Sequence, residues 1–139
     1  MQILVIDGQG GGIGSRIIAA LKPLLPAGYE IVGVGTNVLA TNAMLKAGAD
    51  MGATGENAIL WNVARASLIL GPIGIILANA MLGEITPAMA VAVSGADAVK
   101  VLVPSSKCSV IVTGTESNTL EGYIKQAVQL AIQEIQKNT

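Results

Sequence analysis

The chain has 139 residues, of which 52% are hydrophobic and only 12% are charged, and it carries a net charge of −1 with no histidine. This length predicts a single domain, residues 1–139, that can bury a full core without disulfides. Lysine and arginine are scattered singly, and the aromatic residues are one tryptophan and two tyrosines, which argues against nucleic-acid binding.

Apolar runs of strand length alternate along the chain with segments of helical spacing. In chain order we expect a strand at Ile3–Ile6, a helix from the following glycines to Leu21, a strand at Tyr29–Val34, a helix from Asn37 to Ala47, a helix at Gly55–Arg65, a strand at Leu68–Leu70, a helix from Thr86 to Gly95, strands at Val99–Val103 and Val110–Thr113, and a last helix after Asn118. Side chains that can cap these helices are Asn37, Thr54, Thr86 and, as a capping box, Asn118 with Glu121.

The alternation predicts an α/β fold, a three-layer Rossmann-like sandwich around a mostly parallel five-stranded sheet. Residues 104–109 join the last two predicted strands, and they are fewer than the roughly twelve residues that a parallel crossover needs. We therefore expect Val110–Thr113 to form an antiparallel edge strand. Two strand orders, 3-2-1-4-5 and 2-1-3-4-5, fit these predictions.

A glycine-rich stretch, VIDGQGGGIGSR at Val5–Arg16, joins the first strand to the first helix. The free amides at a helix N-terminus attract anions, and glycines remove the Cβ atoms that would hold a phosphate away. Gly8, Gly12 and Gly14 match the G-x-x-x-G-x-G spacing of short-chain dehydrogenases. A P-loop needs lysine after its last glycine, and Ser15 follows here instead. The alternative is a tight turn that serves only to pack the helix on the strand.

The likeness to dehydrogenases is local. The acid that binds a ribose hydroxyl is missing at the end of the second strand, where Gly35, Thr36 and Asn37 stand. The catalytic Tyr-x-x-x-Lys pair is also missing, because Ala127 follows Tyr123 at that spacing. A small NAD(P)-dependent oxidoreductase is therefore only a further alternative.

Ligands of parallel sheets bind beyond the carboxyl ends of the strands. The predicted ligand-binding residues are Asp7, Gly8, Gln9, Gly10, Gly11, Gly12, Ile13, Gly14, Thr36, Asn37, Glu56, Asn57, Gly71 and Pro72. A structural interpretation stands beside this one: Asp7 would hydrogen-bond the loop and fix its shape, and the other polar residues would begin helices. Glu84 and Thr86 are interpreted in the same way, as a helix start.

No catalytic residue and no metal site is predicted, and the chain has no histidine to activate its single cysteine, Cys108. One cysteine and the lack of a signal-peptide pattern predict a cytoplasmic protein. Residues 66–83 are uncharged, but Gly71, Pro72 and Gly74 interrupt them, so we expect a buried strand rather than a membrane span. The low charge content also predicts a homo-oligomer with an apolar interface.

Five longer phrases, VIDGQGGGIG, GTN-x-LAT-x-AMLKAGA, ATGENAI, GPIGII and MLGEITP-x-MA, resemble an uncharacterised family of small bacterial Rossmann-like proteins, a domain of unknown function. The likeness covers nearly the whole chain. It implies a small cytoplasmic Rossmann-like protein and carries over no catalytic residue.

The leading hypothesis is that the glycine-rich stretch binds a nucleotide or another phosphorylated small molecule, with a nucleotide or dinucleotide as the cofactor class. The alternative is a structural or regulatory protein that associates with itself and holds no ligand.

Overall fold

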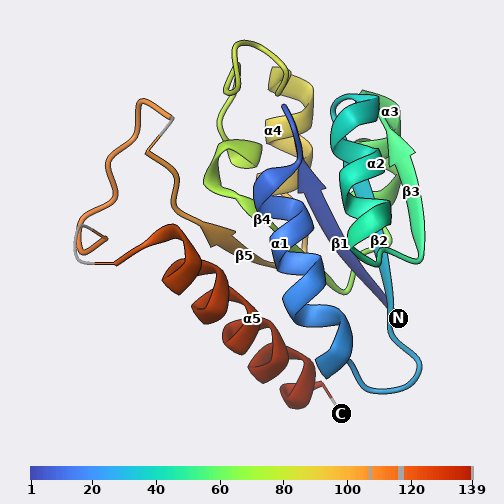
Figure 1. The fold of residues 1–139 in the computed structure, drawn as a ribbon. Helices are drawn as coiled ribbons and strands as arrows, with labels where there is room; N and C mark the ends of the chain where they lie inside the picture. The colour runs from blue at the N-terminus through green and yellow to red at the C-terminus, as the bar shows by residue number, and fades with distance from the viewer. Residues whose placement is uncertain (107, 116–117, 139) are drawn as a thin grey trace.

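The computed structural model describes residues 1–106, 108–115 and 118–138. One parallel sheet forms its centre, and helices cover both faces of that sheet (Figure 1). The strands are β1 (Gln2–Asp7), β2 (Glu30–Gly35), β3 (Met51–Thr54), β4 (Leu68–Pro72) and β5 (Val99–Val103). The helices are α1 (Gly12–Leu21), α2 (Val38–Ala47), α3 (Glu56–Val63), α4 (Pro87–Ser94) and α5 (Leu120–Lys137), with short 3-10 helices η1 (Lys22–Leu24) and η2 (Ile73–Ile76).

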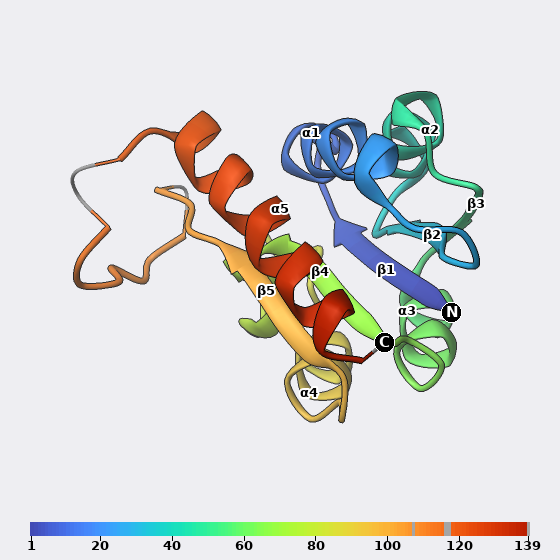
Figure 2. The ribbon, with the colours of Figure 1, turned by 90° about the horizontal axis from the view of Figure 1, so that it is seen from below.

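The core lies in two layers, one on each side of the sheet. Figure 2 shows α1, α2 and α5 on one side and α3 and α4 on the other. Alternate side chains of β1 pack into the two layers: Ile3 and Val5 belong to one buried cluster, and Leu4 and Ile6 belong to the other. All four are fully buried. The unbroken apolar run in the sequence therefore predicted a strand that is covered on both faces.

The α/β class and the three-layer arrangement are confirmed, but the antiparallel edge strand is wrong because all four strand pairings are parallel. Residues 110–113 form no strand and lie in the connection between β5 and α5 (orange in Figure 1). The side chain of Ile111 is 89% exposed. Three apolar residues in a row gave strand propensity here, but no neighbouring strand is there to pair with them.

The fifth strand of the sheet is β3 instead, a strand that was not predicted from the sequence. Its sequence, MGAT, is short and contains a glycine, and no residue in it is fully buried. It pairs with β2 at the edge of the sheet. The observed order is β3-β2-β1-β4-β5. The four strands that were both predicted and observed are β1, β2, β4 and β5, which the prediction numbered 1 to 4. In that numbering their order in the sheet is 2-1-3-4, and this agrees with the predicted order 2-1-3-4-5 except that its fifth strand does not form.

Two predicted caps are confirmed and two are corrected. Asn37 caps α2 by accepting from the amide of Ala40, and Thr86 caps α4. Thr54 does not cap α3, because it ends β3. The last helix is capped by Thr119 rather than by the predicted Asn118–Glu121 box.

The uncharged segment 66–83 folds as β4, η2 and the turns that follow them. Among the described residues, no helix has the length and apolarity needed to cross a bilayer.

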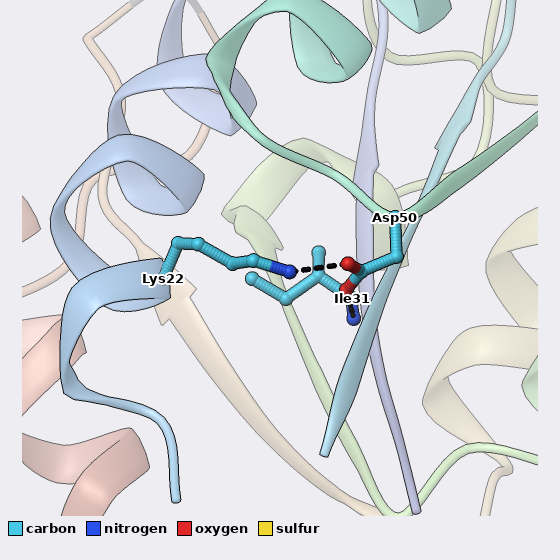
Figure 3. A network of polar contacts seen from close by, with 3 residues as sticks. All are labelled: Lys22, Ile31 and Asp50. Atoms are coloured by element: carbon cyan, nitrogen blue, oxygen red, sulfur yellow. Dashed lines mark hydrogen bonds and ion pairs between the residues drawn. The ribbon is translucent and has the colours of Figure 1, made fainter. Parts of the chain in front are cut away.

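An ion pair joins the first residue of η1, directly after α1, to the turn before β3. The carboxylate of Asp50 accepts from the ammonium group of Lys22 and, at 2.8 Å, from the amide of Ile31 in β2 (Figure 3). The hydrogen bonds from Lys22 and Ile31 hold the pKa of Asp50 below its ordinary value of 3.8.

Replacing Asp50 with asparagine is expected to lower the free energy of unfolding by about 0.5–1 kcal/mol at pH 7, the range of a partly exposed pair. A carboxyl with a lowered folded pKa stabilises the fold above its unfolded value of 3.8, and this contribution disappears as pH falls through the folded pKa. Urea unfolding at pH 7 and pH 3 measures both effects. Asp97→Asn, at an exposed aspartate with no partner in the described part of the chain, is the matched control. Equal stability of the two variants at pH 7 would contradict the prediction.

Candidate functional site

A cleft of about 790 Å³ opens at the carboxyl end of the sheet. It lies beside β1 and β4, where the strand order reverses, which is the usual ligand position in open α/β sheets. Its lining includes most of the glycine loop (residues 8–14, between β1 and the first turn of α1), the residues after β4, the residues after β5, residues 110–112 and the start of α5. The fold therefore brings together three stretches that are far apart in the sequence: the glycine loop, the residues after β4, and the connection from β5 into α5.

The carboxylate of Asp7 holds the glycine loop in shape from inside. Asp7 is 4% exposed, and its two oxygens accept from the amides of Gly8 at 2.8 Å and Gly14 at 2.6 Å. These contacts confirm the structural interpretation of Asp7. Burial raises the pKa of Asp7 above its ordinary value, against the opposing effect of the hydrogen bonds from Gly14 and Gly8.

A second carboxylate, that of Glu84, holds the loop from the β2 side. One oxygen of Glu84 accepts from the amide of Gln9 at 2.8 Å, the hydroxyl of Thr36 at 2.5 Å and the side-chain amide of Asn37 at 2.9 Å. Desolvation alone would raise the pKa of Glu84, but the hydrogen bonds from Thr36, Gln9 and Asn37 together hold it below its ordinary value. We call Glu84 and these three donors the Glu84 clasp.

Three glycines of the loop have a structural reason to be glycine. A Cβ on Gly8 would lie 2.6 Å from the sulfur of Met81, and a Cβ on Gly14 would lie 2.9 Å from the Cβ of Asp7. Gly11 has a φ of 72°, and its Cβ would lie 2.9 Å from the backbone of Ala40 in α2. All three glycines are buried, so a tight turn packed between strand and helix accounts for them.

Gly10 and Gly12 have no such reason. A Cβ on either would meet nothing within 4 Å, neither has a positive φ, and both are exposed and line the cleft. Within the described residues, neither amide donates to a protein atom. The loop therefore presents two free amide donors toward the cleft, with open space beside the Cα atoms of Gly10 and Gly12.

Arg16 adds a positive charge to the same wall. It is exposed, lines the cleft from the second turn of α1, and forms no ion pair with the described residues. Arg16 was not among the residues predicted from the sequence to bind a ligand. Its spacing of four residues from Gly12 places both on one face of α1, and this spacing is the signal that could have indicated it.

Part of the cleft wall is apolar. Ile73, Met81 and Ile111 contribute to its lining, and Tyr123 reaches it from α5. The hydroxyl of Tyr123 is buried and has no hydrogen-bond partner among the described residues. Buried hydroxyls are nearly always paired, so this one is a candidate for contact with a ligand.

The remaining predicted site residues divide between the cleft and other places. Pro72 and Ile13 line the cleft, whereas Gly71 is buried inside β4. Glu56 lies at the start of α3, where its carboxylate accepts from the hydroxyl of Thr86, and Asn57 is exposed beside it; neither lines the cleft.

Cys108 lines the cleft, and its thiol donates to the carbonyl of Ser105 at 3.1 Å. No group of three or more histidine, cysteine, aspartate or glutamate side chains converges anywhere in the described part of the chain. The cleft is therefore partly apolar, and its groups suited to an anion are the free amides of Gly10 and Gly12 and the side chain of Arg16.

The fold is shared with a solved structure, the dodecameric FMN-dependent UbiX-like decarboxylase from Escherichia coli O157:H7. The two chains are 16% identical over 97% of this chain and 94% of the other, with a TM-score of 0.53, so the likeness concerns the fold alone. No curated protein matches the sequence. The sequence phrases described above indicated a family without an assigned activity. Residues 2–136 match the model of such a family, and the chain belongs to the family described as Domain of unknown function (DUF3842).

Proposed function

We propose that the protein binds a nucleotide or another phosphorylated small molecule, with the phosphate at the amides of Gly10 and Gly12. The observation that carries this proposal is the difference between the glycines of the loop. Packing accounts for Gly8, Gly11 and Gly14, whereas the open space and the free amides at Gly10 and Gly12 suit a bound phosphate.

Charge supports the same position. The N-terminus of α1 carries a partial positive charge, and the positively charged residue Arg16 lines the same cleft. The carboxylates of Asp7 and Glu84 are each held by other loop amides. A phosphate would therefore bind to donors that no carboxylate of the described chain occupies.

The protein with the similar fold is FMN-dependent, and flavin mononucleotide is a phosphorylated ligand. This agrees with the class of ligand proposed here. A volume of about 790 Å³ also lies within the roughly 300–1,000 Å³ of ordinary small-molecule sites. The single cysteine suits a reducing compartment, and we place the binding activity in the cytoplasm.

Gly12→Val is expected to remove ligand binding, because the valine side chain would occupy the space where we place the phosphate. The protein should stay folded, because a Cβ at position 12 meets no other atom of the chain within 4 Å. Thermal shift with nucleotides, dinucleotides, sugar phosphates and inorganic phosphate at millimolar concentration measures this. At least one compound should raise the melting temperature of the wild type by a few degrees. Ala19→Val, at an exposed position of α1 away from the cleft, is the matched control and should respond like the wild type.

Two results would contradict the phosphate site. One is the absence of any shift in the wild type across the whole panel. The other is a folded Gly12→Val variant that responds to ligand as the wild type does.

We propose in addition that the protein associates with itself. The side chains of Val38 and Leu39 on α2 are 61% and 74% exposed, and that of Leu82 is 99% exposed. Exposed apolar side chains of this size favour a subunit interface. The protein of similar fold is a dodecamer, which supports the proposal. Light scattering that finds a stable monomer at micromolar concentration would contradict it.

A further inference from the structure

We infer that the ligand is a mononucleotide, with one phosphate end and one planar ring system, and that the site excludes dinucleotides. This inference rests on the proposed phosphate site. It follows from which side of the glycine loop is closed and which side is open.

The β2 side of the loop is closed. In dinucleotide-binding folds the adenosine ribose lies over the carboxyl end of the second strand. Here Thr36 and Asn37 occupy that position, and both donate to Glu84 instead. Met81 also lies against Gly8, within 2.6 Å of where a Cβ would stand. Because none of Thr36, Asn37 and Glu84 lines the cleft, a second nucleotide would find no space there.

The β4 and β5 side of the loop is open, and its lining suits a ring. Besides Gly10 and Gly12, the cleft lining includes the apolar side chains of Ile73 and Ile111. Apolar walls stabilise a planar heteroaromatic ring by burying its faces. The hydroxyl groups of a sugar phosphate would lose their water against the same walls without gaining partners.

Tyr123 supplies the polar contact that such a ring needs. Its hydroxyl is buried and unpartnered, and its side chain belongs to the cleft lining. A ring carbonyl or ring nitrogen is a hydrogen-bond partner that would satisfy it. Inorganic phosphate alone would leave both this hydroxyl and the apolar walls without contacts.

Calorimetric titration with inorganic phosphate, AMP, GMP, flavin mononucleotide and NAD tests the inference. We expect at least one mononucleotide to bind at least about tenfold more tightly than both inorganic phosphate and NAD. Tyr123→Phe keeps the ring of the side chain and is expected to weaken that mononucleotide about tenfold, the usual effect of one hydrogen bond. The affinity for phosphate should stay unchanged. Tyr29→Phe, at a tyrosine outside the cleft, is the matched control and should bind as the wild type does.

The possible failures differ from one another. If phosphate binds and no mononucleotide binds more tightly, the mononucleotide inference is overturned while the phosphate site stands. If NAD binds as tightly as the best mononucleotide, the exclusion of dinucleotides is overturned. If Tyr123→Phe binds that mononucleotide as the wild type does, the contact from Tyr123 is overturned. If no probe binds, phosphate included, both the inference and the proposed function are overturned.

Discussion

Replacing Gly71 with alanine is expected to lower the free energy of unfolding by about 3 kcal/mol or to prevent folding, the largest effect of a single added methyl group in this protein. A Cβ on Gly71 would lie 2.3 Å from the carbonyl oxygen of Ile6 in β1. The oxygen is a backbone atom and the Cβ would be attached directly to backbone, in the neighbouring central strands β1 and β4, so neither can move aside without breaking strand contacts.

Chemical denaturation of Gly71→Ala beside Gly10→Ala measures this effect. A Cβ on Gly10 meets open space, so the control should unfold within about 0.5 kcal/mol of the wild type. A Gly71→Ala variant as stable as the wild type would contradict the prediction. The expected result would make Gly71 a residue of strand packing, although its place at a strand end had suggested contact with a ligand.

Replacing Asp7 with alanine is expected to lower the free energy of unfolding by about 2–4 kcal/mol and to abolish ligand binding. The substitution leaves the amides of Gly8 and Gly14 without their acceptor in a buried place. It also removes the contact that sets the position of the α1 N-terminus relative to β1. Denaturation and the thermal-shift panel measure the two effects separately, and a stable variant that still binds ligand would contradict the prediction.

The pH dependence of the same site is tested with Asp7→Asn, which keeps the size of the side chain. Burial raises the folded pKa of Asp7 above its unfolded value of 3.8, so the folded chain keeps this proton to a higher pH than the unfolded chain. Folding takes up a proton in that window. The stability of the wild type should therefore fall, relative to Asp7→Asn, as pH rises from 3.8 through the folded pKa. Parallel curves for the two proteins would contradict this.

Local patterns explain why much of the fold could be predicted. The continuous apolar run of β1, the cap at Asn37 and the Thr86–Pro87 helix start each depend on neighbouring residues, and each forms as expected. The two errors in the sheet involve short segments. Residues 51–54 have little apolar character and become a strand because β2 offers an edge, whereas residues 110–113 have strand propensity and no edge to join.

The candidate site was predicted less completely, because its parts come from distant segments. Gln9 and Glu84 meet across 75 residues, and Thr36 and Glu84 meet across 48. A helix start was the best interpretation of Glu84 from its neighbours alone. Tyr123 was considered only as a member of a catalytic pair, and its place beside the cleft depends on how α5 packs against α1 and β5.

By itself the sequence determined the α/β alternation, the glycine loop between a buried strand and a helix, and the missing P-loop lysine and ribose-binding acid. These are properties of residue type and short spacing. Only the tertiary structure decided which glycines are needed for packing and which face open space. It also decided that Glu84 closes one side of the loop and that the cleft opens on the other. The physical reason is that close approach, free amides and burial depend on which distant segments the parallel crossovers bring to the carboxyl end of the sheet.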